Sequence, residues 1–465
     1  MNIIIKIIRK ILNIKIDKNG TIIIKKNIPF IHRIFLQNSE NKIFFTKTKK
    51  SHALNIFTVK DALGYDIFAE IKFSSFTFKL QLPVKVEKLL SANGKYISYS
   101  KEPVKKGLVV FESFFGKSYS GQPKYIYEYL LALNLPYQYV WVYQDNTNNI
   151  PGNPTIVKRG SLEYFKYAAK AEYLVNNIVF PFHSKRDETI YLQTWHGTPL
   201  KKLGFDITVA GPEANARENF HKESRNWDYL VTQNSFTTEV LKRAFKFEKS
   251  IIESGYPHND ILIQNSKKRA TEIKISLNIP KDKKVILYAP TWRDNDANAN
   301  WSFNFSLKIN LLKWQKILGN EYVILIRMHH LITKIKGLEE AEGFAYNVSK
   351  YDDIQELSLI SDILITDYSS VFFDFAVTKK PILFFAYDIK EYAENMRGFY
   401  LDIHNDLPGP IIKTNTELLE SIQNIDTIKK EYRKKYEIFN QRFCYLDNGE
   451  CSKKVAEKVF KEINE

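Results

Sequence analysis

Polar side chains that can act on phosphates follow apolar runs of the sequence at four places. The runs suit buried strands, and each is followed by histidine, arginine or serine side chains. The residues concerned are His196, Arg293, Arg327 with His329, and Asp367 with Ser369 and Ser370. Imidazole can exchange a proton near neutral pH, and guanidinium can pair with phosphate oxygens. Together, these residue types indicate chemistry on a phosphate group.

His196 lies in the stretch YLQTWHGTPLKKLG, residues 191–204. The start of this stretch suits a strand, which Gly197 and Pro199 end. A histidine on such a turn is exposed at the edge of a sheet, and Lys201 and Lys202 add positive charge beside it. We expect His196 to accept the proton of a hydroxyl that attacks a phosphate ester, and the two lysines to bind an anionic acceptor. The alternative is an ordinary surface loop.

Arginine and histidine also follow strands in the second half of the chain. In RMHH, which follows YVILI, Arg327 can make two parallel hydrogen bonds to a phosphate. His329 can donate to a leaving phosphate oxygen, although a structural role is the alternative. Arg293 follows another strand, in APTWRD. Asp294 and Asp296 come next at the spacing of a weak metal-binding motif, but we predict no metal there.

Two serines follow the strand in DILITDYSSVFFDFA. Asp367 ends this strand, and Ser369 and Ser370 stand where a helix begins. A helix N-terminus offers free N–H groups and a partial positive charge, which suits a phosphate. We therefore expect these three residues to bind an anionic donor, with a plain helix N-cap as the alternative.

A further polar stretch, GKSYSGQ, precedes a helix near the start of the first series of strands. Its spacing is not that of the Gly-x4-Gly-Lys-Ser/Thr loop that cradles nucleotide phosphates. We expect Lys117 and Ser118 to hold an anionic acceptor.

The elements that must position these residues alternate between strand and helix in two series. One series runs from GLVVFESFFG to ETIYLQTWHG, and the other from KVILYAPTWRD to PILFFAYD. Such alternation predicts an α/β fold class with parallel sheets, whose ligand sites lie at the carboxyl ends of the strands. We expect two doubly wound Rossmann-like domains, residues 105–270 and 271–465, that face one cleft. In the second, Asp353 and Glu356 have capping-box spacing at a helix start.

The first hundred residues have a different pattern. Residues 15–104 are typical of a small antiparallel β-rich domain, with an Asn-Gly hairpin signal in KIDKNGTIIIKK and extended segments up to KYISYS at 95–100. Residues 1–14, MNIIIKIIRKILNI, place isoleucines on one helical face and basic residues largely opposite. They suit a basic amphipathic segment at a membrane surface, with a strand or a core-packing helix as the alternative.

The overall composition indicates an anionic partner but does not identify which one. The 465 residues carry a formal net charge of +16, which attracts polyanions such as nucleic acid, anionic lipid or a phosphate polymer. Alternatively, the positive charge reflects an AT-rich genome, which enriches lysine without any selection for a partner. Cys444 and Cys451 match neither a zinc spacing nor a disulfide scaffold, so we expect a reducing, cytoplasmic compartment. No apolar run reaches the roughly 18 residues that span a membrane.

The order of these motifs resembles the CDP-glycerol glycerophosphotransferase family, whose members build teichoic acids and capsular polymers in bacteria. The resemblance is carried by FESFFGKSYSGQPKYIYEYL, QTWHGTPLKKLG, SGYPHNDIL, LYAPTWRD, RMHH, DILITDYSSVFFDF, PILFFAYDIKEY, RGFYLD and LDNGECSKKVAEKVF. It covers the chain from about residue 107 to the end. It implies the GT-B architecture, which agrees with two α/β domains.

The resemblance also implies roles for the matching residues. His196 would be the general base, His329 would assist at the donor pyrophosphate, and Arg293 and Arg327 would pair with its phosphates. The CDP part would lie against Asp367, Ser369 and Ser370. No cofactor or metal is implied. His330 stands where many relatives have proline, so the shape of this loop can differ from theirs.

The expected reaction moves glycerol phosphate, or a related alditol phosphate, from a CDP-alditol to a hydroxyl of a growing polymer, and CMP leaves. The expected partners are CDP-glycerol or another CDP-alditol, a poly(alditol phosphate) or lipid-linked acceptor, and an anionic membrane surface at the inner face of the cell membrane, but not nucleic acid. One alternative is a nucleotide-sugar glycosyltransferase of the same architecture. The other is a polyanion- or membrane-binding protein without catalytic activity.

Overall fold

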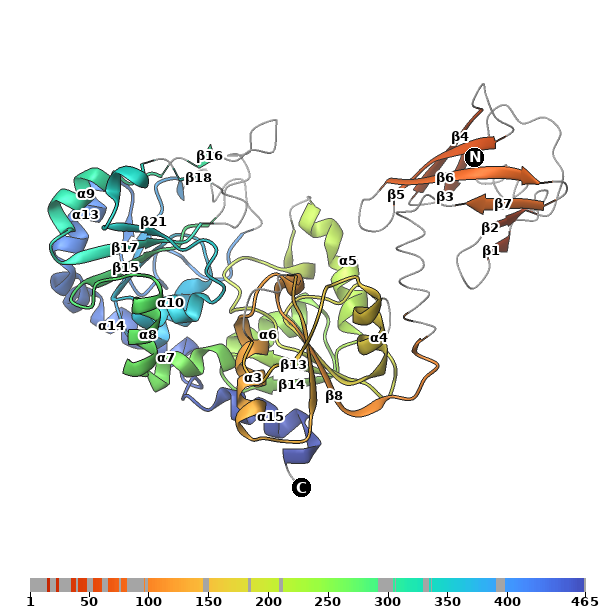
Figure 1. Ribbon diagram of the computed structural model, residues 1–465. Helices are drawn as coiled ribbons and strands as arrows, with labels where there is room; N and C mark the ends of the chain where they lie inside the picture. Colours follow the sequence, from red (N-terminus) through yellow and green to blue (C-terminus); the bar gives the residue numbers. More distant parts are fainter. Residues whose placement is uncertain are drawn as a thin grey trace. The chain divides into compact units, whose positions relative to one another are not determined.

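The computed structural model describes two compact units, which we treat separately (Figure 1). The described residues are 96, 99–144, 150–182, 185–208, 212–291, 307–328, 337–389 and 398–463, with short strands at 304–305 and 334–335 and the strands between 15 and 81. One unit comprises residues 1–103 and 160–170, and the other comprises residues 104–159 and 171–465. The predicted amphipathic segment, residues 1–14, lies outside the described residues.

The first unit contains a seven-stranded antiparallel sheet in the order β1-β2-β7-β6-β5-β4-β3. The strands are β1 (Lys15–Ile16), β2 (Ile22–Ile24), β3 (Phe35–Asn38), β4 (Asn41–Lys47), β5 (Ala53–Lys60), β6 (Asp66–Ser74) and β7 (Thr77–Gln81). Lys15 pairs with Ile23 in antiparallel β1 and β2, so the predicted pairing of these two segments is confirmed, while the Asn-Gly residues between them lie outside the described residues.

The described residues of the segment KYISYS do not form the extended structure that the sequence predicted. Tyr96 and Tyr99 have helical backbone, and both the N–H and the hydroxyl of Ser100 donate to the carbonyl of Tyr96 at 2.8 Å. Tyr96 and Tyr99 are three residues apart and therefore share one helical face, a spacing that the strand prediction overlooked. Helix α4 (Leu162–Lys170) belongs to the same unit, and Lys170 pairs with Glu102 at 2.5 Å.

The second unit begins with a seven-stranded parallel sheet in the order β10-β9-β8-β11-β12-β13-β14. Its strands are β8 (Lys105–Glu112), β9 (Gln138–Val142), β10 (Thr155–Val157), β11 (Ala171–Asn176), β12 (Ile190–Gln193), β13 (Tyr229–Thr232) and β14 (Ser250–Glu253). The central strand β11 is buried along its whole length, as expected of a parallel strand covered on both faces. Strand order reverses between β8 and β11, the position where such folds bind ligands.

Helices and short turns connect these strands. They are η1 (Phe114–Gly116), α3 (Gly121–Ala132), η2 (Gly204–Asp206), α5 (Pro212–Ser224), α6 (Ser235–Ala244), η3 (Pro257–Asn259) and α7 (Asp260–Gln264). Helix α15 (Cys451–Val459) and η7 (Lys461–Ile463) end the described chain. Val455, Val459 and Phe460 share a core with Val109 of β8, so the C-terminal segment completes the first parallel sheet's domain.

A six-stranded parallel sheet follows in the order β19-β17-β15-β20-β21-β22. Its strands are β15 (Lys284–Tyr288), β17 (Tyr322–Ile326), β19 (Ala345–Asn347), β20 (Ile363–Thr366), β21 (Ile382–Phe385) and β22 (Ile411–Ile412). Strands β16 (Asn304–Phe305) and β18 (Lys334–Ile335) form a separate pair. The surrounding helices are α8 (Lys267–Ser276), α9 (Leu311–Leu318), η5 (Glu339–Ala341), α10 (Ile354–Ile360), α11 (Val371–Phe375), η6 (Ala376–Thr378), α13 (Asn415–Gln423) and α14 (Ile425–Phe443).

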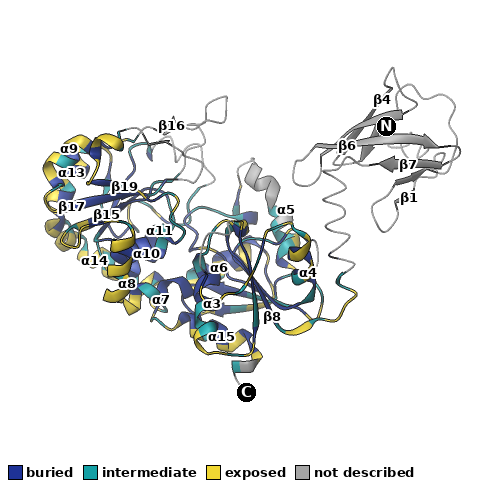
Figure 2. Cartoon of the chain, in the orientation of Figure 1, coloured by how far each residue is buried: buried dark blue, intermediate teal, exposed yellow. Residues whose placement is uncertain are grey.

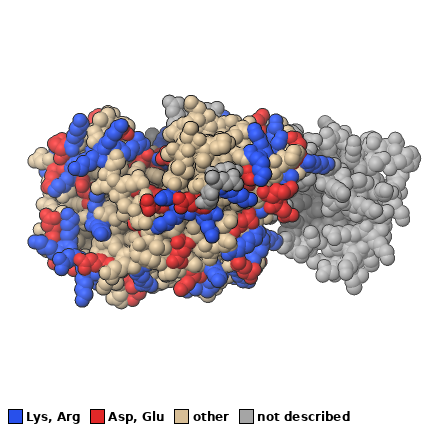
Figure 3. All heavy atoms as spheres, turned by 90° about the horizontal axis from the view of Figure 1, so that it is seen from below, with Lys and Arg blue, Asp and Glu red and all other residues tan. Residues whose placement is uncertain are grey.

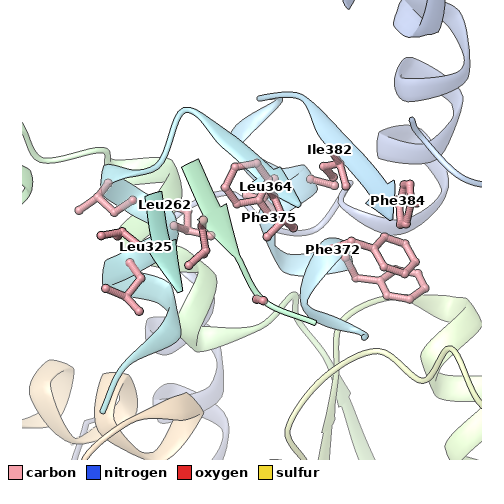
Figure 4. Packing of buried hydrophobic residues seen from close by; sticks show 14 of the residues in the cluster. Leu262, Leu325, Leu364, Phe372, Phe375, Ile382 and Phe384 are labelled. Carbon is pink, nitrogen blue, oxygen red and sulfur yellow. The ribbon is translucent and has the colours of Figure 1, made fainter. Parts of the chain in front are cut away.

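Apolar side chains fill both faces of this second sheet. On one face, Leu325 and Leu364 of the strands pack with Phe372 and Phe375 of α11 and with Leu262 of α7 (Figure 4). On the other face, Trp314 of α9 and Leu418 of α13 pack with Ile324 and other strand residues. The central strands of the two parallel sheets are buried, whereas many residues on the outer faces of the helices are exposed (Figure 2). Two doubly wound α/β domains therefore exist as predicted.

Basic and acidic side chains alternate over the described surface that Figure 3 presents. Among the described residues, none of the helices has the length and apolar character of a membrane span.

Candidate active site

A pocket of about 250 Å³ lies where the carboxyl ends of the two parallel sheets meet. One wall is the turn after β12, residues 195–201 with Leu203, and the other is formed by Thr291, Tyr368, Ser369 and Ser370. The two walls approach closely, because a Cβ atom on Gly197 would lie 3.3 Å from the Ser370 hydroxyl oxygen. The pocket therefore brings together His196, Lys201, Ser369 and Ser370, which the sequence had singled out.

The turn that carries His196 has an unusual backbone. Trp195 has φ +55°, a left-handed conformation that costs a bulky residue of the order of 1–3 kcal/mol. It is held by two hydrogen bonds: the Trp195 N–H donates to Gln193 Oε1 at 2.9 Å, and Gln122 Nε2 donates to the Thr194 carbonyl at 2.6 Å. The indole of Trp195 is buried while His196 is exposed, so the strained turn presents the imidazole to the pocket.

One hydrogen bond orients the imidazole of His196. Its Nδ1 lies 3.0 Å from the carbonyl oxygen of Asn177, which can only accept, so Nδ1 carries the proton and Nε2 keeps a free lone pair. Asn177 is itself fixed, because its Oδ1 accepts from the Phe114 N–H at 2.9 Å and its Nδ2 donates to Ser113 at 3.1 Å. This is the tautomer that a general base requires.

The surroundings of His196 keep it neutral. Its ring is accessible from the pocket, but the protein atoms around it remove much of its hydration and lower its pKa below the ordinary 6.5. The bond to Asn177 opposes this shift, and the nearby His258 adds to it. At neutral pH, the His196 imidazole is therefore ready to accept a proton.

The opposite wall is braced by main-chain hydrogen bonds. Buried Asp367 accepts from the N–H groups of Thr291 at 2.8 Å and Tyr368 at 2.6 Å, and so ties the loop after β15 to the loop after β20. Ser370 is the N-cap of α11, but its hydroxyl makes no capping bond. Helix α11 has only five residues, so the two hydroxyls offer more to an anion here than the helix dipole does.

The lysines after His196 lie in a segment that is hydrogen-bonded to the second α/β domain. Lys201 lines the pocket, and its main chain forms an isolated antiparallel β-bridge with Phe399. The Lys202 N–H donates to the Gly398 carbonyl at 3.0 Å, and the Leu203 N–H donates to the Tyr400 hydroxyl at 3.0 Å. Both side chains are half-buried. Positive charge thus borders the pocket beside His196.

Lys117 and Ser118 do not line this pocket. Ser118 Oγ lies 2.8 Å from Ser120 Oγ, and the next residue, Tyr119, donates its N–H to Asp352 at 3.0 Å. The GKSYSGQ loop therefore lies where the two α/β domains meet.

Arg327 braces a loop of its own domain. Its guanidinium donates to the carbonyls of Val348 at 3.4 Å, Tyr351, and Asp352 at 3.3 Å, and burial lowers its pKa. It does not line the pocket. Arg293 and His329, like the neighbouring His330, lie outside the described residues.

A buried ion cluster joins the two α/β domains and was not foreseen. Lys124 of α3 lies 2.7 Å from both Asp353 and Glu356 at the start of α10, and Arg269 of α8 reaches Glu356 at 2.6 Å. The predicted capping box is therefore wrong in one half: Asp353 accepts from the Gln355 N–H, but Glu356 faces the cations. Although burial opposes it, the charge of Lys124 brings the pKa of Glu356 down to about 2.

A second cavity and the possibility of a metal site were also considered as locations for the active site. A larger cavity of about 560 Å³ lies beside α14 at the amino end of β21, the opposite edge of the second sheet from the loop that carries Ser369, and it contains none of the predicted site residues. Within the described part of the chain, no group of three or more His, Cys, Asp or Glu side chains could hold a metal ion.

Comparisons with known proteins show which proteins this chain is similar to. The chain is 44% identical over 374 residues to the teichoic acid poly(glycerol phosphate) polymerase of Staphylococcus epidermidis and 43% identical over 433 residues to that of Bacillus subtilis. These alignments cover 78% and 89% of this chain but only 52% and 57% of those polymerases, so the chain spans about half of their length.

A solved structure of the wall teichoic acid polymerase TagF superposes with a TM-score of 0.76 at 42% identity, over 82% of this chain and 96% of that one. The GT-B architecture expected from the sequence is thereby confirmed. The family model described as CDP-Glycerol:Poly(glycerophosphate) glycerophosphotransferase matches residues 95–461. The chain therefore belongs to the CDP-glycerol:poly(glycerophosphate) glycerophosphotransferase family.

Proposed function

We propose that this protein transfers glycerol phosphate from CDP-glycerol to a terminal hydroxyl of a growing poly(glycerol phosphate) chain. The observation that carries the proposal is the pocket itself. It sets an oriented, neutral imidazole on one wall opposite two serine hydroxyls on the other, with Lys201 at its border. A base, hydroxyl donors and a cation are the groups that phosphoryl transfer to an alcohol needs.

In the proposed reaction, the acceptor hydroxyl attacks the β-phosphorus of CDP-glycerol while His196 Nε2 takes its proton. A new bond forms between the acceptor oxygen and phosphorus, and the bond from that phosphorus to the oxygen of CMP breaks. General-base catalysis of this kind contributes roughly 10²–10⁴-fold. The remaining acceleration comes from positioning and from the stabilisation of negative charge on the phosphoryl oxygens.

The other residues divide between the two substrates. Ser369 and Ser370 bind the donor phosphates, together with Arg293 and His329, which remain predictions from the sequence. Lys201 and Lys202 bind the anionic acceptor next to His196. Asp367 and Arg327 hold the donor-side loops through main-chain hydrogen bonds. Lys117 and Ser118 remain candidates for a more distant part of the acceptor.

The choice of glycerol rests on the family and on relatives that are named for poly(glycerol phosphate). A panel of ligands tests it by thermal shift: CDP-glycerol, CDP-ribitol, UDP-glucose and an oligonucleotide. We expect the largest rise in Tm with CDP-glycerol. A larger rise with UDP-glucose would favour the glycosyltransferase alternative, and a rise with the oligonucleotide alone would favour a polyanion-binding protein.

We also propose that the enzyme works as a peripheral protein at the inner face of the cell membrane. The support is the net charge of +16 and the basic, isoleucine-rich sequence of residues 1–14. Each basic residue near an anionic surface contributes about 1 kcal/mol. Deletion of residues 1–14 should release the protein from anionic vesicles in a sedimentation assay without changing turnover on a short soluble acceptor. Unchanged vesicle binding would assign membrane attachment to another surface.

A further inference from the structure

Two sequence stretches that line no part of the pocket meet at the junction of the α/β domains. They are SGYPHND, residues 254–260, and LDNGECS, residues 446–452. The Tyr256 N–H donates to Asp447 Oδ1 at 2.9 Å, and Asp260 accepts from the N–H groups of Cys451 and Ser452, both at 2.8 Å. The approach is close, since a Cβ atom on Gly255 would lie 2.8 Å from the Leu446 carbonyl oxygen.

From this junction, one chain of hydrogen bonds reaches the wall that carries His196. Gln233 Nε2 donates to Asp447 Oδ2 at 2.7 Å, and Gln233 Oε1 accepts from the hydroxyl of Thr198. Thr198 is two residues after His196 in the strained turn. Gln233 and Thr198 have no exposed surface, and Asp447 is only 7% exposed. The amide of Gln233 thus links a carboxylate at the junction to the turn of the base.

A second chain of hydrogen bonds reaches the wall that carries Ser370. Asn259 Nδ2 donates to Asp447 Oδ1 at 3.1 Å and to Asp374 Oδ1 at 3.4 Å. His258 Nε2 also lies 3.1 Å from Asp374 Oδ1. Asp374 belongs to α11, whose N-cap is Ser370. Asn259 therefore stands between the carboxylate that holds one wall and the carboxylate that holds the other.

We propose that Gln233, Asn259 and Asp447 are positioning residues that fix the distance between His196 and the donor-binding serines. The inference rests on the proposed function. Apolar packing can hold two domains together, but hydrogen bonds also fix orientation, and a buried polar network loses stability if any member is left unpaired. Reacting groups need this precision, since a misplacement of about 1 Å can cost about 100-fold in rate.

The same cluster also sets the charge near the base. Asp374 of α11 contacts His258, and Asp447 in the loop after α14 and Asp353 at the N-cap of α10 act on His258 electrostatically. They raise the pKa of His258 against the effect of burial. Positive charge on His258 in turn adds to the lowering of the His196 pKa. The junction and the base are therefore coupled electrostatically as well as through hydrogen bonds.

The first test replaces the linking amide. Gln233→Met keeps the approximate shape but removes both hydrogen bonds, and Gln423→Met, at an exposed position of α13, is the matched control. With CDP-glycerol and a short acceptor, we expect Gln233→Met to lower kcat by about 10–100-fold with KM for the donor within about twofold. A variant with normal kcat per folded molecule, or a fall in kcat that only matches the fraction of folded protein lost, as measured by circular dichroism, would overturn the positioning role.

The second test uses a substitution that a merely structural role would not make pH-sensitive. Gln233→Glu keeps the oxygen that accepts from Thr198, and it can donate to Asp447 only while the carboxyl pair shares a proton. Like-charged carboxylates raise each other's apparent pKa, so the link is present at low pH and is lost as pH rises. We expect the ratio of variant to wild-type kcat to fall with rising pH.

A ratio that does not change with pH would overturn the proposal, even if Gln233→Met proved too unstable to assay. Wild-type protein that makes no product from CDP-glycerol would overturn the proposed function and this inference together. Active wild type with unaffected variants would overturn the inference alone.

Discussion

The two parallel sheets of the second unit have the same strand order up to the sixth strand, yet their carboxyl edges are built differently. The edge that carries His196 has a bulky residue in a left-handed conformation and an imidazole with a lowered pKa. The edge that carries Ser369 and Ser370 is braced by Asp367, which accepts main-chain N–H groups from two loops. Under the proposed function, strain therefore accompanies the group proposed to react, whereas regular bracing holds the groups proposed to bind.

The largest expected effect comes from removing the base on the strained edge. His196→Ala should lower kcat by about 10²–10⁴-fold, because the acceptor hydroxyl then loses its proton acceptor. The affinity for CDP-glycerol, measured by calorimetry, should be nearly unchanged. His404→Ala, at an exposed histidine away from the pocket, is the control and should have normal activity. Lost donor affinity in His196→Ala would move His196 to the donor side of the comparison.

The second-largest effect is expected at the contact between the two α/β domains, where a substitution should lower the free energy of unfolding. Lys124→Met leaves Asp353 and Glu356 buried with a lysine partner removed. Breaking a buried ion pair from one side costs about 3–5 kcal/mol. We expect chemical denaturation to show a loss of this size, with Lys430→Met on exposed α14 as the control. A loss below about 1 kcal/mol, the range of a surface ion pair, would mean that water enters this junction.

Substitutions at the edge that carries Ser369 and Ser370 should lower the affinity for the donor and leave proton transfer unchanged. Ser369→Ala combined with Ser370→Ala should weaken CDP-glycerol binding, since each lost hydrogen bond to a charged group costs about 1.5–3 kcal/mol. Acceptor KM should change less than donor affinity, as measured by calorimetry and steady-state kinetics. An unchanged donor affinity would reduce the two serines to ordinary residues at a helix start.

The smallest effect concerns the histidine that faces Asp374. The folded-state pKa of His258 is raised above its ordinary value, so its pairing stabilises the protein fully below about pH 6.5 and loses this effect as pH rises through the raised value. We therefore expect the Tm difference between wild type and His258→Gln to be larger in acid than in alkali. A difference that grows with pH would show that His258 is neutral in the folded protein.

Short-range patterns predicted much of this molecule. Apolar runs predicted the strands of both α/β domains. Gly and Pro signals within a few residues predicted the pairing of β1 with β2 and the turn that carries His196. The extended structure predicted for KYISYS was wrong at Tyr96 and Tyr99, because alternation in so short a segment also fits a helical turn. The Asp353–Glu356 spacing failed as a capping box because a buried lysine from another domain competes for the glutamate.

Long-range partners could not be predicted from the sequence. The bond between Gln233 and Asp447 joins residues 214 positions apart, and that between Lys124 and Asp353 joins residues 229 apart. No local pattern marks these partners, because each is a single polar residue within or just beyond an otherwise ordinary element. Arg327 was expected to bind a phosphate, and only the fold reveals the three carbonyls that its guanidinium contacts.

The central claim is that the pocket transfers glycerol phosphate with His196 as the base. The most direct test incubates wild type and His196→Ala with CDP-glycerol and a short poly(glycerol phosphate) acceptor, and follows the products by mass spectrometry. The account predicts acceptors that grow by glycerol phosphate units, with one CMP released for each unit, in wild type but not in the variant. Release of CMP without growth of the acceptor, or equal growth in His196→Ala, would contradict it.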